Sequence, residues 1–192
     1  MLVMEREGVI TALRTLGEVL ASRGHHYEIV AIGGSSLLLL GLVARPTADV
    51  DVVALVEDGR YRVARPLPQP LDEAQADVGA TLGLGGKWLN PGPTDLLDFG
   101  LPEGFQDRVE TLDFGGLTVL LAARVDQICF KLYAAVDQGS RSKHFADLRQ
   151  LEPTREELLH AARWTIEHDP SPGYRRVLLE TLRQLGIEDA GL

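Results

Sequence analysis

The clearest chemical feature of the sequence is a pair of aspartates, Asp49 and Asp51, at the start of an apolar run that ends at Val56. Residues two apart on a strand point to the same side of a sheet, so the two carboxylates would be neighbours. Neighbouring carboxylates repel each other and lose hydration when partly buried, and a bound cation relieves both costs. Mg²⁺ prefers a few carboxylate oxygens together with phosphate oxygens and water. The pair therefore fits a magnesium site, and taken alone it also fits two surface carboxylates on an edge strand.

A short polar turn precedes this pair. It consists of Gly33, Gly34, Ser35 and Ser36, between an apolar run that predicts a strand and one that predicts a helix. Glycines let the backbone approach a phosphate closely, and the exposed amides at the start of a helix favour anions. Arg45 and Thr47 lie between the turn and the aspartates, close enough along the chain to contact the same phosphate. The segment indicates a phosphate site beside a metal site, although the turn by itself also fits a serine N-cap.

The order of these features resembles a known signature. Gly-Gly-Ser, a helix and then Arg-x-Thr-x-Asp-x-Asp, from Gly33 to Asp51, is similar to the DNA polymerase β-like nucleotidyltransferase superfamily. A later segment, Lys131 to Leu148, is similar to the Lys-x-x-Ala…Arg-x-x-Lys-Asp-x-x-Asp-Leu region of the AbiEii-like abortive-infection nucleotidyltransferases and their small uncharacterised relatives. The resemblance covers about residues 30–151, and it departs from those relatives at His144, where Asp is common.

The resemblance implies a set of metal ligands and a set of nucleotide contacts. Asp49 and Asp51 would hold the metal ions, and a third carboxylate on a neighbouring strand would act as ligand or base. We expect Asp95 in that third position, with Asp98 as the alternative. The nucleotide would be bound by Gly33, Gly34, Ser35, Ser36, Arg45, Thr47 and Lys131.

Lys131 and Asp147 are open to two interpretations. By resemblance, Lys131 contacts the triphosphate and Asp147 is the late aspartate of the second motif, so both count as catalytic candidates. From the residues alone, Lys131 lies in an otherwise apolar stretch of a predicted helix, where a lysine extends to water or meets an anion. Asp147 falls on the next predicted helix, so an ion pair that only ties the two helices together is the structural alternative.

The implied activity is that of a metal-dependent nucleotidyltransferase. It would use Mg²⁺ or Mn²⁺ and a nucleoside triphosphate, ATP or CTP, and would transfer the nucleoside monophosphate to an acceptor. By resemblance the acceptor is RNA or tRNA, and the protein is the toxin of a toxin–antitoxin pair with a cognate antitoxin as partner. The alternatives are a protein or small-molecule acceptor, and a catalytically inactive binding module of the same fold.

Composition narrows the class of protein. With 45% hydrophobic and 24% charged residues among 192, the chain has the balance of a globular protein. The net charge of −9 argues against a surface that is basic throughout, as nucleic-acid-binding proteins usually have. RNA binding would therefore need a local basic cluster such as Arg141–His144 or Arg175–Arg176. The single cysteine, Cys129, excludes an internal disulfide and a cysteine zinc site. No apolar run approaches the roughly 20 residues of a membrane span, so we expect a cytoplasmic protein with no membrane partner.

The pattern of apolar residues predicts an α/β (α+β) fold. We expect strands at 27–32, 49–56, 81–89 and 94–99, a hairpin at 109–119 turning at Gly115-Gly116, and helices at 5–22, 35–42, 71–79, 122–137, 142–151, 154–168 and 171–185. Thr154 with Glu157 forms a capping box. The expected domains are a nucleotidyltransferase-like core with a mixed sheet flanked by helices, residues 1–121, and a helical C-terminal part packed on it, residues 122–192.

Overall fold

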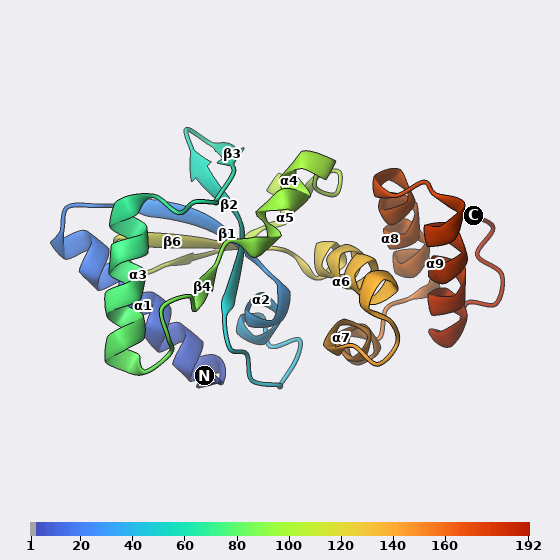
Figure 1. Ribbon diagram of the computed structural model, residues 1–192, viewed down its shortest axis with the longest axis horizontal. Helices are drawn as coiled ribbons and strands as arrows, with labels where there is room; N and C mark the ends of the chain where they lie inside the picture. Colours follow the sequence, from blue (N-terminus) through green and yellow to red (C-terminus); the bar gives the residue numbers. More distant parts are fainter. Residues whose placement is uncertain (1–2) are drawn as a thin grey trace. The chain divides into compact units, whose positions relative to one another are not determined.

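A mixed sheet flanked by helices forms the first part of the chain, as expected (Figure 1). The computed structural model describes residues 3–192, which divide into two units, one up to Ala123 and the other Arg124–Leu192. The strands are β1 (Tyr27–Ile32), β2 (Val50–Glu57), β3 (Arg60–Arg62), β4 (Leu89–Asn90), β5 (Glu110–Asp113) and β6 (Leu117–Leu121). Their order is β3-β2-β1-β6-β5, and β4 pairs with β2. β1 runs antiparallel to β2 and parallel to β6.

The central strands are buried on both faces, which explains their continuous apolar runs. In β1, Ile29, Val30 and Ala31 have no exposed surface, and neither do Val52 and Val53 of β2. The sheet is accompanied by α1 (Arg6–Ser22), α2 (Gly33–Leu39), α3 (Gln69–Leu82), a 3₁₀ helix η1 (Gly92–Asp95), α4 (Leu96–Phe99) and α5 (Phe105–Arg108). The predicted strands 27–32 and 49–56 and the predicted hairpin at 109–119 are therefore confirmed, apart from shifts of a residue or two at their ends.

Two predicted strands are wrong. The segment 81–89 is not a strand, because α3 continues to Leu82 and ends at Gly83, which adopts the left-handed conformation that glycine favours. Only Leu89 and Asn90 then pair with β2. The segment 94–99 is helical instead, since Pro93 lies in the first turn of η1, where its fixed φ and missing N–H are compatible with a helix.

The second unit is helical, as expected. It contains α6 (Arg124–Gln138), α7 (Lys143–Leu151), α8 (Arg155–His168) and α9 (Pro172–Gln184). The capping box of α8 is confirmed, because the Thr154 hydroxyl accepts from the Glu157 amide and the Glu157 carboxylate accepts from the Thr154 amide. None of the helices within residues 3–192 has both the length and the apolar character needed to cross a bilayer.

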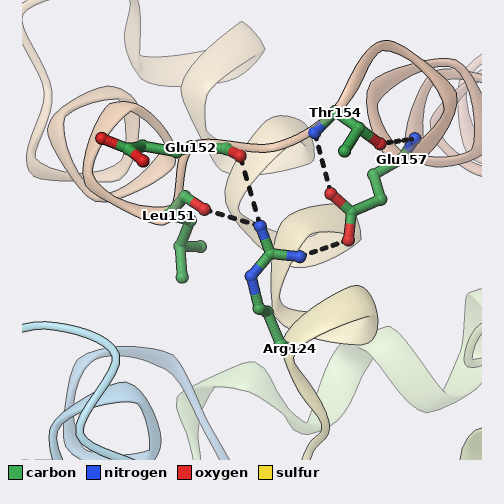
Figure 2. Close-up of polar contacts among 5 residues, drawn as sticks. All are labelled: Arg124, Leu151, Glu152, Thr154 and Glu157. Atoms are coloured by element: carbon green, nitrogen blue, oxygen red, sulfur yellow. Dashed lines mark hydrogen bonds and ion pairs between the residues drawn. The ribbon is translucent and has the colours of Figure 1, made fainter.

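Arg124 connects three segments of this second unit (Figure 2). Its guanidinium pairs with the Glu157 carboxylate and donates to the carbonyl oxygen of Leu151 over 2.6 Å. The same Glu157 carboxylate accepts from the Thr154 amide at 2.8 Å. Hydrogen bonds from these two partners lower the pKa of Glu157 below its ordinary value, although partial burial acts in the opposite direction. Arg124 and Glu157 therefore fix the start of α6 against the end of α7 and the start of α8.

Candidate functional site

The sheet register places Asp51 between two other strands. β2 pairs with β1 on one side, where Asp51 lies opposite Ile32, and with β4 on the other side, where Asp51 lies opposite Asn90. The residue after Ile32 is Gly33, the first residue of α2. The Asp51 carboxylate is half-buried, and the strand order puts Gly33 on its β1 side and Asn90 on its β4 side.

Gly33 contacts Asp51 so closely that no side chain fits there. Its φ of 76° lies in the left-handed region, which favours glycine. A Cβ atom added at this position would lie 2.6 Å from Oδ2 of Asp51. The predicted glycine turn and the predicted Asp-x-Asp strand are thus brought together by the antiparallel pairing of β1 and β2.

Asn90 fixes the other oxygen of Asp51. Its Nδ2 donates to Oδ1 of Asp51 at 2.8 Å, and its Oδ1 accepts from the Gly92 amide at 3.0 Å. Because the Gly92 N–H needs an acceptor, the side-chain amide cannot turn over without losing both hydrogen bonds. The sequence analysis missed Asn90, since an asparagine before Pro-Gly is typical of a turn and carries no sign that it pairs with a strand 39 positions earlier in the chain.

Asp49 lies one residue before β2 and is also half-buried. Within residues 3–192 its carboxylate forms no hydrogen bond and no ion pair. Its backbone is held in place, because its carbonyl oxygen accepts from Oγ1 of Thr47 at 3.0 Å. Thr47 is itself anchored by two backbone hydrogen bonds to Met4, of 2.6 and 2.9 Å. The loop therefore holds a carboxylate that has no protein partner in the described part of the chain.

Arg45 and Thr47 lie against Gly34. A Cβ atom at Gly34 would lie 3.0 Å from Nη2 of Arg45 and 3.4 Å from Oγ1 of Thr47. A glycine at this position leaves room for the guanidinium and the hydroxyl beside the turn. The glycine turn thus lies against Asp51 through Gly33 and against Arg45 and Thr47 through Gly34, and Thr47 binds the backbone of Asp49.

Ser35 and Ser36 follow the turn within α2. They are 1% and 0% exposed, and neither hydroxyl has a hydrogen-bond partner among the described residues. Buried hydroxyls without a partner are uncommon in folded proteins, because each loses hydration without compensation. The two serines are therefore polar atoms that the fold alone leaves unsatisfied next to the glycine turn.

Asp95 does not lie on a strand beside Asp51, so this expected placement is wrong. It is in η1 with 60% of its side chain exposed, and it forms an ion pair of 2.6 Å with Arg65. Asp98 is exposed in α4. Over residues 3–192 no three acidic, histidine or cysteine side chains gather as they would around a metal ion. On the side of β2 away from β1, the strand position beside Asp51 belongs to Asn90, because β4 pairs with that part of β2.

Lys131 and Asp147 are brought together in the second unit. Lys131 Nζ lies 2.7 Å from Oδ2 of Asp147, and their side chains are only 3% and 1% exposed. The pair joins α6 to α7, so the ion pair that the structural alternative expects is present. A contact of Lys131 with a triphosphate stays a prediction.

The carboxylates of Asp49 and Asp51, two positions apart in the chain, are donors that suit a hard divalent cation. The Asp49 carboxylate has no partner within the described residues. Mg²⁺ or Mn²⁺ in such a site completes its coordination with water and phosphate oxygens rather than with a full set of protein ligands. The residues present therefore fit a cation that arrives together with a phosphate compound.

Comparison with known proteins gives one match. The family model described as "Nucleotidyltransferase of unknown function (DUF6036)" matches residues 10–148. The matched segment contains the glycine turn, both aspartates, Asn90 and the Lys131–Asp147 pair. Searches of curated proteins and of solved structures found no match.

Proposed function

The chain belongs to this family of nucleotidyltransferases, and we propose that it transfers a nucleoside monophosphate from a nucleoside triphosphate to an acceptor hydroxyl. Asp49 and Asp51 hold Mg²⁺ or Mn²⁺ in this proposal. The observation that carries it is the half-buried Asp49 carboxylate, which has no partner within residues 3–192 although its backbone is fixed by Thr47. A fold that holds an unpaired carboxylate in a defined place is expected where a cation binds.

The reaction forms one bond and breaks one. The acceptor hydroxyl oxygen bonds to the α-phosphorus, and the bond from that phosphorus to the bridging oxygen of the pyrophosphate breaks. Pyrophosphate leaves with the electron pair of that bond, and the hydroxyl proton passes to solvent water. When bound, the divalent cation neutralises phosphate charge and lowers the pKa of the attacking hydroxyl.

The protein's own residues bind and orient the triphosphate. Arg45 neutralises non-bridging phosphate oxygens, and Gly33 and Gly34 let those oxygens come close to the backbone. The hydroxyls of Ser35 and Ser36 have no partner among the described residues, and a phosphate oxygen would supply one. Asn90 keeps Asp51 in one orientation through its hydrogen bond to Oδ1.

Three of the predicted catalytic residues have less support. The Asp95 carboxylate is paired with Arg65 on the surface, so we do not carry it forward as the base or as a metal ligand. Lys131 and Asp147 neutralise each other in a buried pair, which supports a structural role for both.

The acceptor is either an RNA end, such as that of tRNA, or a smaller molecule. The family resemblance favours RNA, and with it the role of a toxin that a cognate antitoxin restrains. The net charge of −9 favours an acceptor with a small footprint, because an extended RNA surface needs a basic excess. The terminal nucleotide of an RNA chain is an acceptor that agrees with both the family resemblance and the negative net charge.

The proposal is tested by incubating the protein with each of the four α-labelled nucleoside triphosphates, Mg²⁺ or Mn²⁺, and total RNA. We expect incorporation of label into RNA and release of pyrophosphate, both abolished by chelation of the metal and by Asp49→Asn. Equilibrium dialysis of the metal–triphosphate complex is measured in parallel. A protein that neither binds any triphosphate in the presence of metal nor releases pyrophosphate would overturn the proposal.

A further inference from the structure

A pocket lies on the β4 side of Asp51, with Asn90 in its wall. The pocket, called here the Gln75 pocket, has a volume of about 350 Å³ and is lined by polar and charged side chains, namely Arg65, Asp72, Gln75, Lys87 and Asn90, with apolar walls from Leu67 and Leu89. All of these residues belong to the first unit. Ligand pockets in proteins span ~300–1,000 Å³, so this one has room for a group of about one nucleotide.

Gln75 is buried with an unused acceptor. It is 2% exposed, and its Nε2 donates to Oδ1 of Asp72 at 3.0 Å and to the carbonyl oxygen of Gly86 at 2.8 Å. Both hydrogens of the amide are thus used, which fixes its orientation and leaves Oε1 as the free atom. Oε1 has no partner among residues 3–192. A buried acceptor of this kind calls for a donor, such as a hydroxyl or amino group of a ligand.

The pocket also carries positive charge. Lys87 is exposed and makes no hydrogen bond or ion pair with any residue from 3 to 192. Arg65 uses Nη2 for its bond to Asp95. In a chain with a net charge of −9, an unpaired lysine and an arginine in the wall of one pocket are a local exception. They suit an anionic group. Among anionic groups, phosphate is the one that nucleotidyltransferases act on.

We propose that the Gln75 pocket binds the acceptor of the transfer reaction, and that this acceptor is a nucleotide, either free or at the end of an RNA chain. The inference rests on the proposed function. The acceptor's phosphate contacts Lys87 and its sugar or base donates to Gln75. Asn90 lines the pocket and bonds to Asp51 at 2.8 Å, so a nucleotide in the pocket has its hydroxyls next to the metal-binding carboxylates. The triphosphate, bound by Arg45 and the glycine turn, approaches Asp51 from the β1 side.

The test separates acceptor binding from triphosphate binding by leaving out the metal. Binding of AMP and CMP is measured by calorimetry in the presence of a chelator, with adenosine as the phosphate-free probe and a short single-stranded RNA as the polymeric one. We expect Lys87→Glu to weaken AMP and CMP binding about tenfold or more, while Arg60→Glu, the same charge change at an exposed position on β3, leaves it unchanged. Asp49→Asn should bind AMP as well as the wild type does.

Each result has a definite meaning. The pocket assignment is overturned if Lys87→Glu binds AMP as the wild type does, or if adenosine binds as tightly as AMP. Sensitivity of the RNA to Lys87→Glu identifies an RNA end as the natural source, and sensitivity of the mononucleotides alone identifies a free nucleotide. If Asp49→Asn abolishes transfer while Lys87→Glu changes neither transfer nor AMP binding, the pocket assignment fails and the proposed function stands. If no triphosphate binds with metal present, the proposed function itself fails.

Discussion

The two units differ in whether the polar groups around their motifs have partners within the protein. In the second unit, Lys131 and Asp147 are both almost fully buried, and each has the other as a partner at 2.7 Å. In the first unit, the Asp49 carboxylate is half-buried with no partner within the described residues, and the buried Oε1 of Gln75 also has none. Both units carry segments that resemble the same enzymes, but the charged pair of the second segment is satisfied within the protein, whereas the Asp49 carboxylate of the first has no partner among residues 3–192.

In the proposed function the first motif binds the ligand and the second holds the fold together, and this difference supports that division. Folded proteins nearly always satisfy their buried polar groups, and the exceptions occur preferentially at functional sites. A charged side chain that forms an ion pair within the protein is already neutralised. Such a pair stabilises the folded state or destabilises it only slightly. A charge without such a partner destabilises the protein unless a ligand supplies it. We therefore expect substitutions at the paired residues to change stability, and those at the unpaired ones to change binding and transfer.

Removing one member of the buried pair has the largest expected effect. Lys131→Met leaves the Asp147 carboxylate buried without its cation, which should lower the free energy of unfolding by ~3–5 kcal/mol. The measurement is urea unfolding followed by circular dichroism. The double variant Lys131→Met, Asp147→Leu removes both charges and should recover most of the loss. The distinction between the two units is contradicted if Lys131→Met has the unfolding free energy of the wild type and instead loses triphosphate binding, because Lys131 would then contact the ligand.

Asp49→Asn should show the reverse behaviour. Changes next to metal ligands typically cost 10–100-fold, so loss of a ligand charge should lower metal-dependent transfer by about 100-fold or more. Because the carboxylate has no partner among residues 3–192, the free energy of unfolding should change by no more than ~0.5 kcal/mol. Asp58→Asn, an exposed position just beyond the other end of β2, makes the same charge change and serves as control. Equal transfer rates in Asp49→Asn and Asp58→Asn would remove Asp49 from the site.

The sequence predicted the parts of the site that are close together along the chain. The glycine turn and the two aspartates lie on one strand–helix–strand segment, where composition and periodicity suffice. Asn90 could not be predicted, because its role depends on the pairing of a two-residue strand with β2, and such a short strand has no pattern of its own. The third carboxylate was placed wrongly for the same reason. Asp95 follows a proline that begins a helical turn, so it leaves the sheet before reaching Asp51.

The structural interpretation of Lys131 shows a second limit. Two partners fit one lysine in an apolar helix, a phosphate or an aspartate on the next helix, and periodicity could not choose between them. Only the contact of Nζ with Asp147 and the burial of both side chains decide in favour of the ion pair. A charged residue within an apolar stretch of sequence is thus weaker evidence for a bound ligand than a charged side chain that has no partner in the folded structure.

Gly33→Ala tests how closely the turn and Asp51 depend on each other. Alanine in the left-handed conformation costs ~1–2 kcal/mol, and here its Cβ would also meet Oδ2 of Asp51 at 2.6 Å. Gly41 is the matched control, because its φ is 71° and nothing lies within 4 Å of a Cβ added there. We expect Gly33→Ala to be less stable than Gly41→Ala in urea unfolding, and only Gly33→Ala to weaken triphosphate binding. Identical losses in the two variants would show that Asp51 moves aside freely.

The smallest expected effect concerns the Arg124–Glu157 contact of the second unit (Figure 2). The folded-state pKa of Glu157 lies below its ordinary value of 4.5, because the hydrogen bonds from Thr154 and Arg124 outweigh partial burial, which raises it. Its contribution to stability is therefore present above the ordinary value and is lost as the pH falls through the lowered one. Glu157→Gln should lose about 1 kcal/mol near neutral pH, the typical worth of a helix cap.

The measurement is urea unfolding of the wild type, Glu157→Gln and Glu156→Gln from neutral pH down to about pH 3, below the ordinary value for a glutamate. Glu156 is the exposed neighbour in the first turn of α8, so its variant controls for loss of charge near the start of the helix. The gap between wild type and Glu157→Gln should narrow as the solution becomes acidic, while the transfer rate near neutral pH stays the same in all three proteins. A gap that does not depend on pH would mean that the Glu157 contact acts through packing rather than through its charge. A fall in transfer for Glu157→Gln alone would mean that a satisfied ion pair also serves catalysis, which is the outcome that contradicts the distinction between the two units most directly.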